Sequence, residues 1–88
     1  MNAATRELFR HNLIAQLCAN GAPMKPAALK IGARAGGFEP ADQDLDAEIQ
    51  YLIDKELVAP VDKAISPEMK RWRITAAGRD YAAQEGLA

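Results

Sequence analysis

The chain has 88 residues, a formal net charge of -1 and 49% hydrophobic residues, which predicts one small folded domain over residues 1–88 and not a disordered segment. A single cysteine, Cys18, excludes a disulfide framework and a multi-cysteine zinc site. The apolar runs are too short to cross a membrane, and the charges scattered over residues 1–20 do not resemble a signal peptide, so we expect a cytoplasmic protein.

Two helices are predicted before residue 36. Apolar residues recur at spacings of three and four over residues 4–19, which is the pattern of a helix with one buried face. Asn20-Gly21 supplies a left-handed residue to end this helix. The second helix covers residues 27–35, because Pro26 suits a first helical turn and two glycines follow Ala35.

A third helix is predicted over residues 42–55. Asp42 is a suitable N-cap, and further acids in the first turn favour the positive end of the helix dipole. The apolar positions recur at helical spacing and are expected to face the core: Leu45, Ile49, Leu52 and Ile53.

The pattern then changes to that of a β-hairpin. Residues 57–61 are apolar and partly β-branched, and residues 70–74 alternate, with Trp72 and Ile74 on the face expected in the core. Residues 62–69 are expected to form a long hairpin loop. Pro60 lacks an N–H, which indicates either that its strand lies at a sheet edge or that the pairing stops there.

A last helix is predicted from Thr75, its expected N-cap, to about residue 84. Gly78 is unfavourable inside it. The hairpin has to pack against the helices, because two strands alone are only marginally stable. The sequence thus predicts an α+β fold, mostly α: a three-helix bundle, a two-stranded β-hairpin and a C-terminal helix.

This order of elements resembles a winged helix-turn-helix domain. Residues 73–81, Arg-Ile-Thr-Ala-Ala-Gly-Arg-Asp-Tyr, resemble the strand-to-helix corner of many bacterial winged-helix regulators, where a Leu-Thr-x-x-Gly pattern leaves the wing. Residues 52–61 are similar to the exit from a recognition helix into the first wing strand. The chain resembles compact regulators of the arsenic-repressor and multiple-antibiotic-resistance type, and faintly the small winged-helix proteins of Mu-like prophages.

The resemblance implies a DNA-binding transcriptional regulator, with the third helix in the major groove of double-stranded DNA and the hairpin wing on phosphates or the minor groove. The wing residues expected to touch DNA are Lys63, Lys70, Arg71 and Arg73. The third-helix residues expected to touch DNA are Gln43, Ala47, Gln50 and Tyr51. A homodimer through the first and last helices is also implied, with alanines that allow close approach: Ala3, Ala4, Ala15, Ala82 and Ala83.

The charge pattern opposes part of this picture, because residues 39–56 carry seven acids and one base. Acids facing DNA phosphates repel them. These acids are interpreted either as stabilisers of the helix N-terminus on a solvated face, or as a surface for a basic protein partner formed by Asp44, Asp46 and Asp54. The alternative function is therefore a protein–protein interaction module, a phage or bacterial adaptor that keeps the winged-helix fold.

The basic residues also have a second interpretation. The wing residues either bind DNA phosphates or form a solvated strand face whose charges keep the sheet edge from pairing with other strands. Lys25, Lys30 and Arg34 are interpreted mainly as a solvated face of the second helix, although in a winged-helix fold the second helix can also lie over the DNA backbone.

No catalytic or metal-binding arrangement is predicted. His11 and Cys18 lie two turns apart on one helix, too far to share a metal ion, with His11 expected at the surface and Cys18 in the core. The carboxylates are expected on an exposed helix without lysine or histidine partners. We therefore expect no enzyme, no cofactor and no metal.

Overall fold

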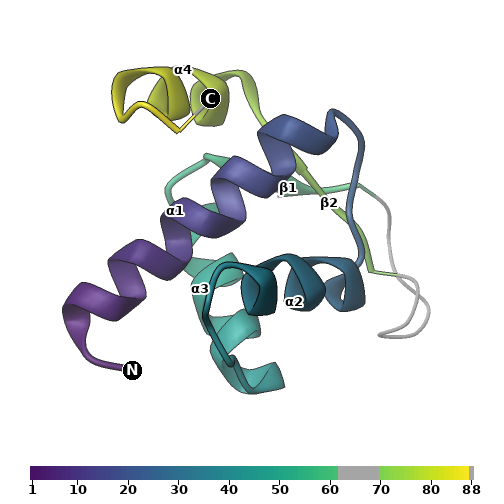
Figure 1. Cartoon of the computed structure of the whole chain (residues 1–88). Coiled ribbons are helices and arrows are strands. Elements are labelled where there is room, and N and C mark those ends of the chain that lie inside the picture. Colours follow the sequence, from purple (N-terminus) through teal and green to yellow (C-terminus); the bar gives the residue numbers. More distant parts are fainter. Residues whose placement is uncertain (62–69, 88) are drawn as a thin grey trace.

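The described part of the chain consists of four helices and a two-stranded antiparallel hairpin (Figure 1). The structure, a computed structural model, describes residues 1–61 and 70–87. The elements in chain order are α1 (Ala3–Asn20), α2 (Pro26–Ala35), α3 (Asp42–Asp54), β1 (Val58–Pro60), β2 (Trp72–Ile74) and α4 (Ala76–Gln84). The fold is therefore α+β and mostly helical, as the sequence predicts.

The first two helices begin and end at the predicted signals. The side chain of Asn2 caps α1 by accepting a hydrogen bond from the backbone N–H of Thr5 at 2.8 Å. Gly21 ends α1 in the left-handed conformation, with φ of 69°. Pro26 opens α2, where its missing N–H costs no hydrogen bond.

The N-cap predicted for α3 is wrong by one residue. The cap is Ala41, and Asp42 is the first helical residue. Alanine has no side-chain acceptor, so it cannot cap the N–H groups of the first turn. Instead, the carboxylate of Asp44 accepts a hydrogen bond from the backbone N–H of Ala41 at 3.0 Å. The helix ends at Asp54, and Glu56 follows with a left-handed φ of 63°.

The hairpin pairs Val58 with Ile74 and Pro60 with Trp72. Among the residues that the structure describes, β1 pairs with β2 alone, so Pro60 lies on an edge strand, which is one of the two predicted arrangements. The other edge of β2 is bridged by Met24, which was not predicted to take part. The N–H of Met24 donates to the carbonyl of Trp72 at 2.9 Å, and the N–H of Trp72 donates back at 3.0 Å. The predicted loop over residues 62–69 lies outside the described residues.

The core lies between α1, the other helices and the inner face of the hairpin. Trp72 and Ile74 are buried in one cluster with Leu45, Ile49 and Leu52, which confirms the predicted strand register, whereas Ile53 is only half-buried against this cluster. In Figure 1, α1 runs across the middle of the molecule, with α4 on one side and α2 and α3 on the other. It supplies four buried apolar side chains to the core: Phe9, Leu13, Ile14 and Leu17.

The alanines proposed for a dimer contact are not equivalent. Ala82 is fully buried in the core, so its expected place in a dimer contact is wrong. It is buried because α4 packs on the core of its own chain. Ala3, Ala4 and Ala83 are exposed.

Candidate nucleic-acid interface

The bridge between Met24 and Trp72 brings together two basic segments that are far apart in sequence. Lys25 follows Met24 and is the N-cap of α2, while Lys70 lies just before β2. A pocket of about 530 Å³ opens between these segments and the start of α3. We call it the lysine pocket, and its lining residues are Lys25, Pro26, Ala27, Lys30, Asp42, Leu45, Asp46 and Lys70.

One of the three lysines is neutralised within the pocket. The Nζ atom of Lys30 lies 2.5 Å from a carboxylate oxygen of Asp42, which ties α2 to the first residue of α3. The Lys30 ammonium group lowers the pKa of the Asp42 carboxyl through this hydrogen bond and through its charge. The expectation that these carboxylates lack lysine partners is therefore wrong for Asp42.

The charges of Lys25 and Lys70 are exposed to solvent and are not neutralised by an ion pair within residues 1–61 and 70–87. The first turn of α2 beside them contains no acid. Backbone N–H groups at a helix N-terminus favour anions, so the local field of α2 adds to that of the two lysines.

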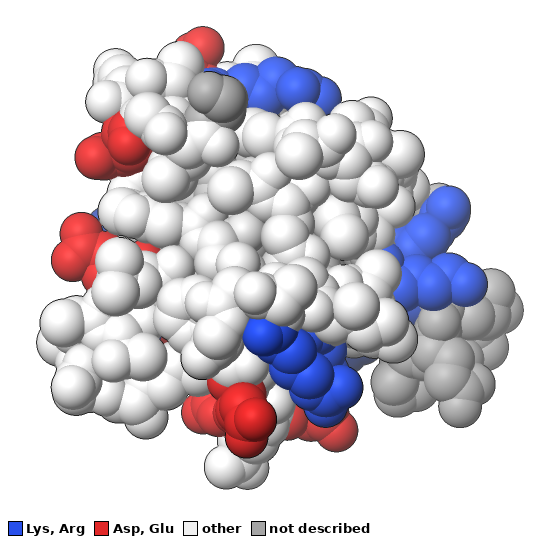
Figure 2. Space-filling view, viewed as in Figure 1, with Lys and Arg blue, Asp and Glu red and all other residues white. Residues whose placement is uncertain are grey.

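The predicted wing arginines are exposed on the face of β2 opposite to Trp72. Arg73 and Arg71 flank the buried tryptophan, as the alternation predicts. A guanidinium nitrogen of Arg73 lies 3.4 Å from the carbonyl of Ile74. In Figure 2, several Lys and Arg side chains lie at the right-hand edge of the molecule. Lys63 lies outside the described residues.

The exposed side of α3 is polar and acidic. Its outermost stripe has helical spacing and consists of Gln43, Ala47, Gln50 and Asp54. The amide of Gln50 donates to the carboxylate of Asp54 at 2.9 Å, and Asp46 is exposed beside the stripe. Tyr51 lies about 80° around the helix from Gln43, at 100° per residue. Its ring faces the guanidinium group of Arg10 at 3.8 Å, so it is separate from the stripe.

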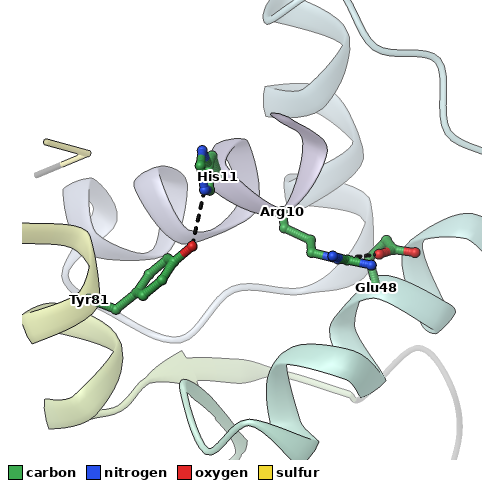
Figure 3. A network of polar contacts seen from close by, with 4 residues as sticks. All are labelled: Arg10, His11, Glu48 and Tyr81. Carbon is green, nitrogen blue, oxygen red and sulfur yellow. Dashed lines mark hydrogen bonds and ion pairs between the residues drawn. The ribbon is translucent and has the colours of Figure 1, made fainter. Parts of the chain in front are cut away.

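The acids of α3 have distinct roles. Glu48 is buried, with 7% of its surface exposed, and pairs with the Nε atom of Arg10 at 2.6 Å. The expectation that the carboxylates are exposed is therefore wrong for Glu48, and its partner is an arginine (Figure 3). Asp42 and Asp44 also have partners within the chain, although Asp42 stays exposed: it pairs with Lys30, and Asp44 accepts from the backbone N–H of Ala41. This leaves Asp46 and Asp54 as the acids on the outer side of α3.

No protein-family model, curated protein or solved structure matches the chain. Across residues 1–61 and 70–87, His, Cys, Asp and Glu side chains form no cluster of three or more that suits a metal ion. The helices in the same ranges are too short or too polar to cross a membrane.

Proposed function

We propose that this protein is a winged helix-turn-helix DNA-binding protein that holds the phosphate backbone of duplex DNA through Lys25 and Lys70, assisted by Arg71 and Arg73. The observation that carries the proposal is the Met24–Trp72 bridge, which brings Lys25 and Lys70 to one pocket at the N-terminus of α2. Lysine and arginine contacts to phosphate supply most of the affinity of sequence-independent DNA binding.

In this proposal α3 is the helix that lies in the major groove. Its exposed stripe contains Gln43, Ala47 and Gln50. Glutamine can form two hydrogen bonds to adenine, and an alanine methyl can contact the methyl group of thymine. The start of α3 lines the lysine pocket through Asp42, Leu45 and Asp46, so phosphate contacts and the stripe lie next to each other.

The same geometry predicts weak binding. Asp46 and Asp54 lie on the side of α3 that approaches the groove, and each repels phosphate. We infer a transcriptional regulator that acts as a homodimer through the exposed faces of α1 and α4, because two half-sites add their binding energies.

The test compares lysine variants by fluorescence anisotropy on a random-sequence duplex. Lys25→Gln and Lys70→Gln should each reduce the slope of log K against log salt by about one unit, because each removes one phosphate contact. Arg34→Gln is the matched control, since it removes one exposed positive charge at the end of α2, outside the lysine pocket, and should leave the slope unchanged. Equal slopes for Lys25→Gln, Lys70→Gln and Arg34→Gln would reject the lysine pocket as the phosphate contact.

The outer side of α3 favours a second candidate, a protein-interaction module. The exposed residues Asp46 and Asp54 lie there without a lysine or arginine in the stripe. Such a surface complements a basic partner protein, because opposite potentials across an interface promote association. Asp46→Asn separates the two functions, because the loss of the negative charge should strengthen binding to DNA but weaken binding to a basic protein.

A further inference from the structure

A smaller pocket, of about 160 Å³, lies on the other side of the Met24–Trp72 bridge from the lysine pocket. It lies between the turn that joins α1 to α2, the end of β2 and α4, and we call it the arginine pocket. Its lining residues include Leu17, Gly21, Ala22, Arg73, Ile74 and Arg79. Pockets for drug-sized ligands have volumes of about 300–1,000 Å³, so this one suits a single small group.

The charge of the arginine pocket comes from Arg73 on β2 and Arg79 on α4. Both side chains are exposed. A guanidinium nitrogen of Arg73 lies 3.4 Å from the carbonyl oxygen of Ile74. The side chain of Arg79 forms no hydrogen bond or ion pair with any residue in 1–61 and 70–87. Two positive charges therefore line one small pocket, and none of the described residues around it is an acid.

The C-terminal end of α1 compensates for only part of this charge. Leu17 and Gly21 belong to that end of the helix, whose last turn contains no basic residue. A helix C-terminus carries about half a negative charge, so about one and a half positive charges remain beside the two arginines. An anion bound between the guanidinium groups would relieve their mutual repulsion.

The backbone around the arginine pocket is held by its own hydrogen bonds. The N–H of Gly21 donates to the carbonyl of Leu17 at 3.3 Å, and the side-chain amide of Asn20 donates to the carbonyl of Ala22 at 2.9 Å. Leu17 is also a buried core residue. A preformed site loses less conformational freedom on binding than a site that has to be ordered, which favours even a small ligand.

The pair of arginines favours a phosphate group over a carboxylate. Guanidinium groups bind both anions through paired N–H donors. A carboxylate has two oxygens in one plane, and a single arginine can bind both of them. A phosphate is tetrahedral, so its oxygens point in several directions and can accept hydrogen bonds from arginines on two different elements.

We propose that the arginine pocket binds one phosphate group between Arg73 and Arg79. The DNA backbone and a free phosphate present the same kind of oxygen, so the chemistry is shared and the experiments below separate the two sources. The inference stands on the residues of this pocket, and it does not depend on DNA binding by the lysine pocket.

Inorganic phosphate is the probe, and backbone amide chemical shifts measured by NMR at constant ionic strength are the readout. Saturable shifts are expected at the lining residues, with a Kd on the order of 5 mM. Arg73→Gln and Arg79→Gln should each weaken binding by about threefold or more, because each removes a charged pair of donors. Arg34→Gln removes an exposed positive charge outside the pocket and should leave the Kd unchanged.

Ala22→Asp tests the pocket while both arginines stay in place. It adds a carboxylate to the lining at an exposed position and should weaken phosphate binding by about threefold or more. Ala35→Asp, at an exposed position outside the pocket, is the matched control and should have no effect. The proposal is overturned if phosphate gives no saturable shifts up to ~50 mM, if acetate binds as tightly as phosphate, or if the controls change the Kd as much as the pocket variants do.

A salt titration of duplex DNA with Arg79→Gln identifies the source of the phosphate. A slope reduced by about one unit relative to the wild type assigns the pocket to the DNA backbone. An unchanged slope, together with saturable binding of inorganic phosphate, assigns it to a free phosphate or a phosphate monoester. Failure of the lysine-pocket test would remove only the proposed function, because the phosphate shifts are measured without DNA.

Discussion

Gly78 lies in the first turn of α4, where the helix meets the carbonyl oxygen of Leu57. A Cβ atom at this position would overlap that oxygen and press on the side chain of Ile74. The backbone N–H of Gly78 also donates to the hydroxyl of Thr75 at 2.9 Å, which completes the N-cap. Gly78 is unfavourable for the predicted helix, but it is required because α4 packs closely against the connection between α3 and β1.

Gly78→Ala should lower the free energy of unfolding by about 1–3 kcal/mol, because a backbone oxygen cannot move aside as a side chain does. Helix propensity alone predicts a gain of about 1 kcal/mol from the same change. Urea denaturation measures the difference. Ala77→Gly, at the exposed neighbouring position, serves as the control and should cost about 1 kcal/mol through propensity only. A more stable Gly78→Ala protein would contradict the contact.

Asp42 provides a test of the contact between α2 and α3. Its hydrogen bond to Lys30 and the charge of that lysine hold the pKa of the Asp42 carboxyl below its ordinary value of 3.8. We expect Lys30→Gln to raise this pKa towards the ordinary value, as followed by NMR titration of the carboxyl carbon. An unchanged pKa in Lys30→Gln would show that the ion pair does not form.

The sign of the pH effect follows from the direction of the shift. A carboxyl with a lowered pKa in the folded state stabilises the fold above its unfolded pKa, and this contribution is lost as the pH falls through the folded pKa. For Asp42 the loss should therefore occur below about pH 4. Lys30→Gln should remove this part of the acid dependence and leave the stability at neutral pH little changed, because the aspartate is exposed to solvent.

At the scale of the element, some acidic residues of α3 stabilise the helix and others are exposed to solvent without such a role. The carboxylate of Asp44 caps the helix through the N–H of Ala41, whereas Asp46 is exposed beside the outer stripe. The two residues are only two positions apart, and sequence reasoning gave them the same role. Their difference follows from the position of the N-cap, which lies one residue before the predicted one.

Asp46→Asn and Asp44→Asn should therefore have different effects. Asp46→Asn should strengthen binding to random duplex DNA by about two- to fivefold with little change in stability, since it removes a charge that faces phosphate. Asp44→Asn should lower the free energy of unfolding by about 0.5–1 kcal/mol, because an amide oxygen is a weaker cap than a carboxylate. Anisotropy and urea denaturation of both variants provide the readouts. Identical effects of the two changes would contradict the separation.

At the scale of the whole molecule, the sequence predicts the elements better than their contacts. Helical spacing, Asn20-Gly21 and Thr75 locate the helices to within about two residues, because periodicity and caps are local signals. Strand alternation also predicts the burial of Trp72 and Ile74 correctly. The winged-helix family itself stays a prediction.

Contacts between distant residues explain what the sequence did not show. Met24 pairs with Trp72 as an isolated bridge, and one residue carries no periodic pattern, so the meeting of Lys25 and Lys70 was not visible. Glu48 is buried because Arg10 reaches it from α1. The signal available in the sequence was the position of this glutamate beside the apolar stripe of α3.

A titration of random-sequence duplex DNA with the wild-type protein at two salt concentrations tests the central claim most directly. In each subunit, four cations on the phosphate backbone, from Lys25, Lys70, Arg71 and Arg73, predict a slope of about -3.6 in log K against log salt for each subunit that binds. Because of the acids on α3, we expect a Kd weaker than about 10⁻⁴ M near 150 mM salt and roughly fifty-fold tighter binding near 50 mM. Absence of binding at the lower salt, or equal affinity at the two concentrations, would contradict the claim that this fold holds DNA through its lysine pocket and hairpin.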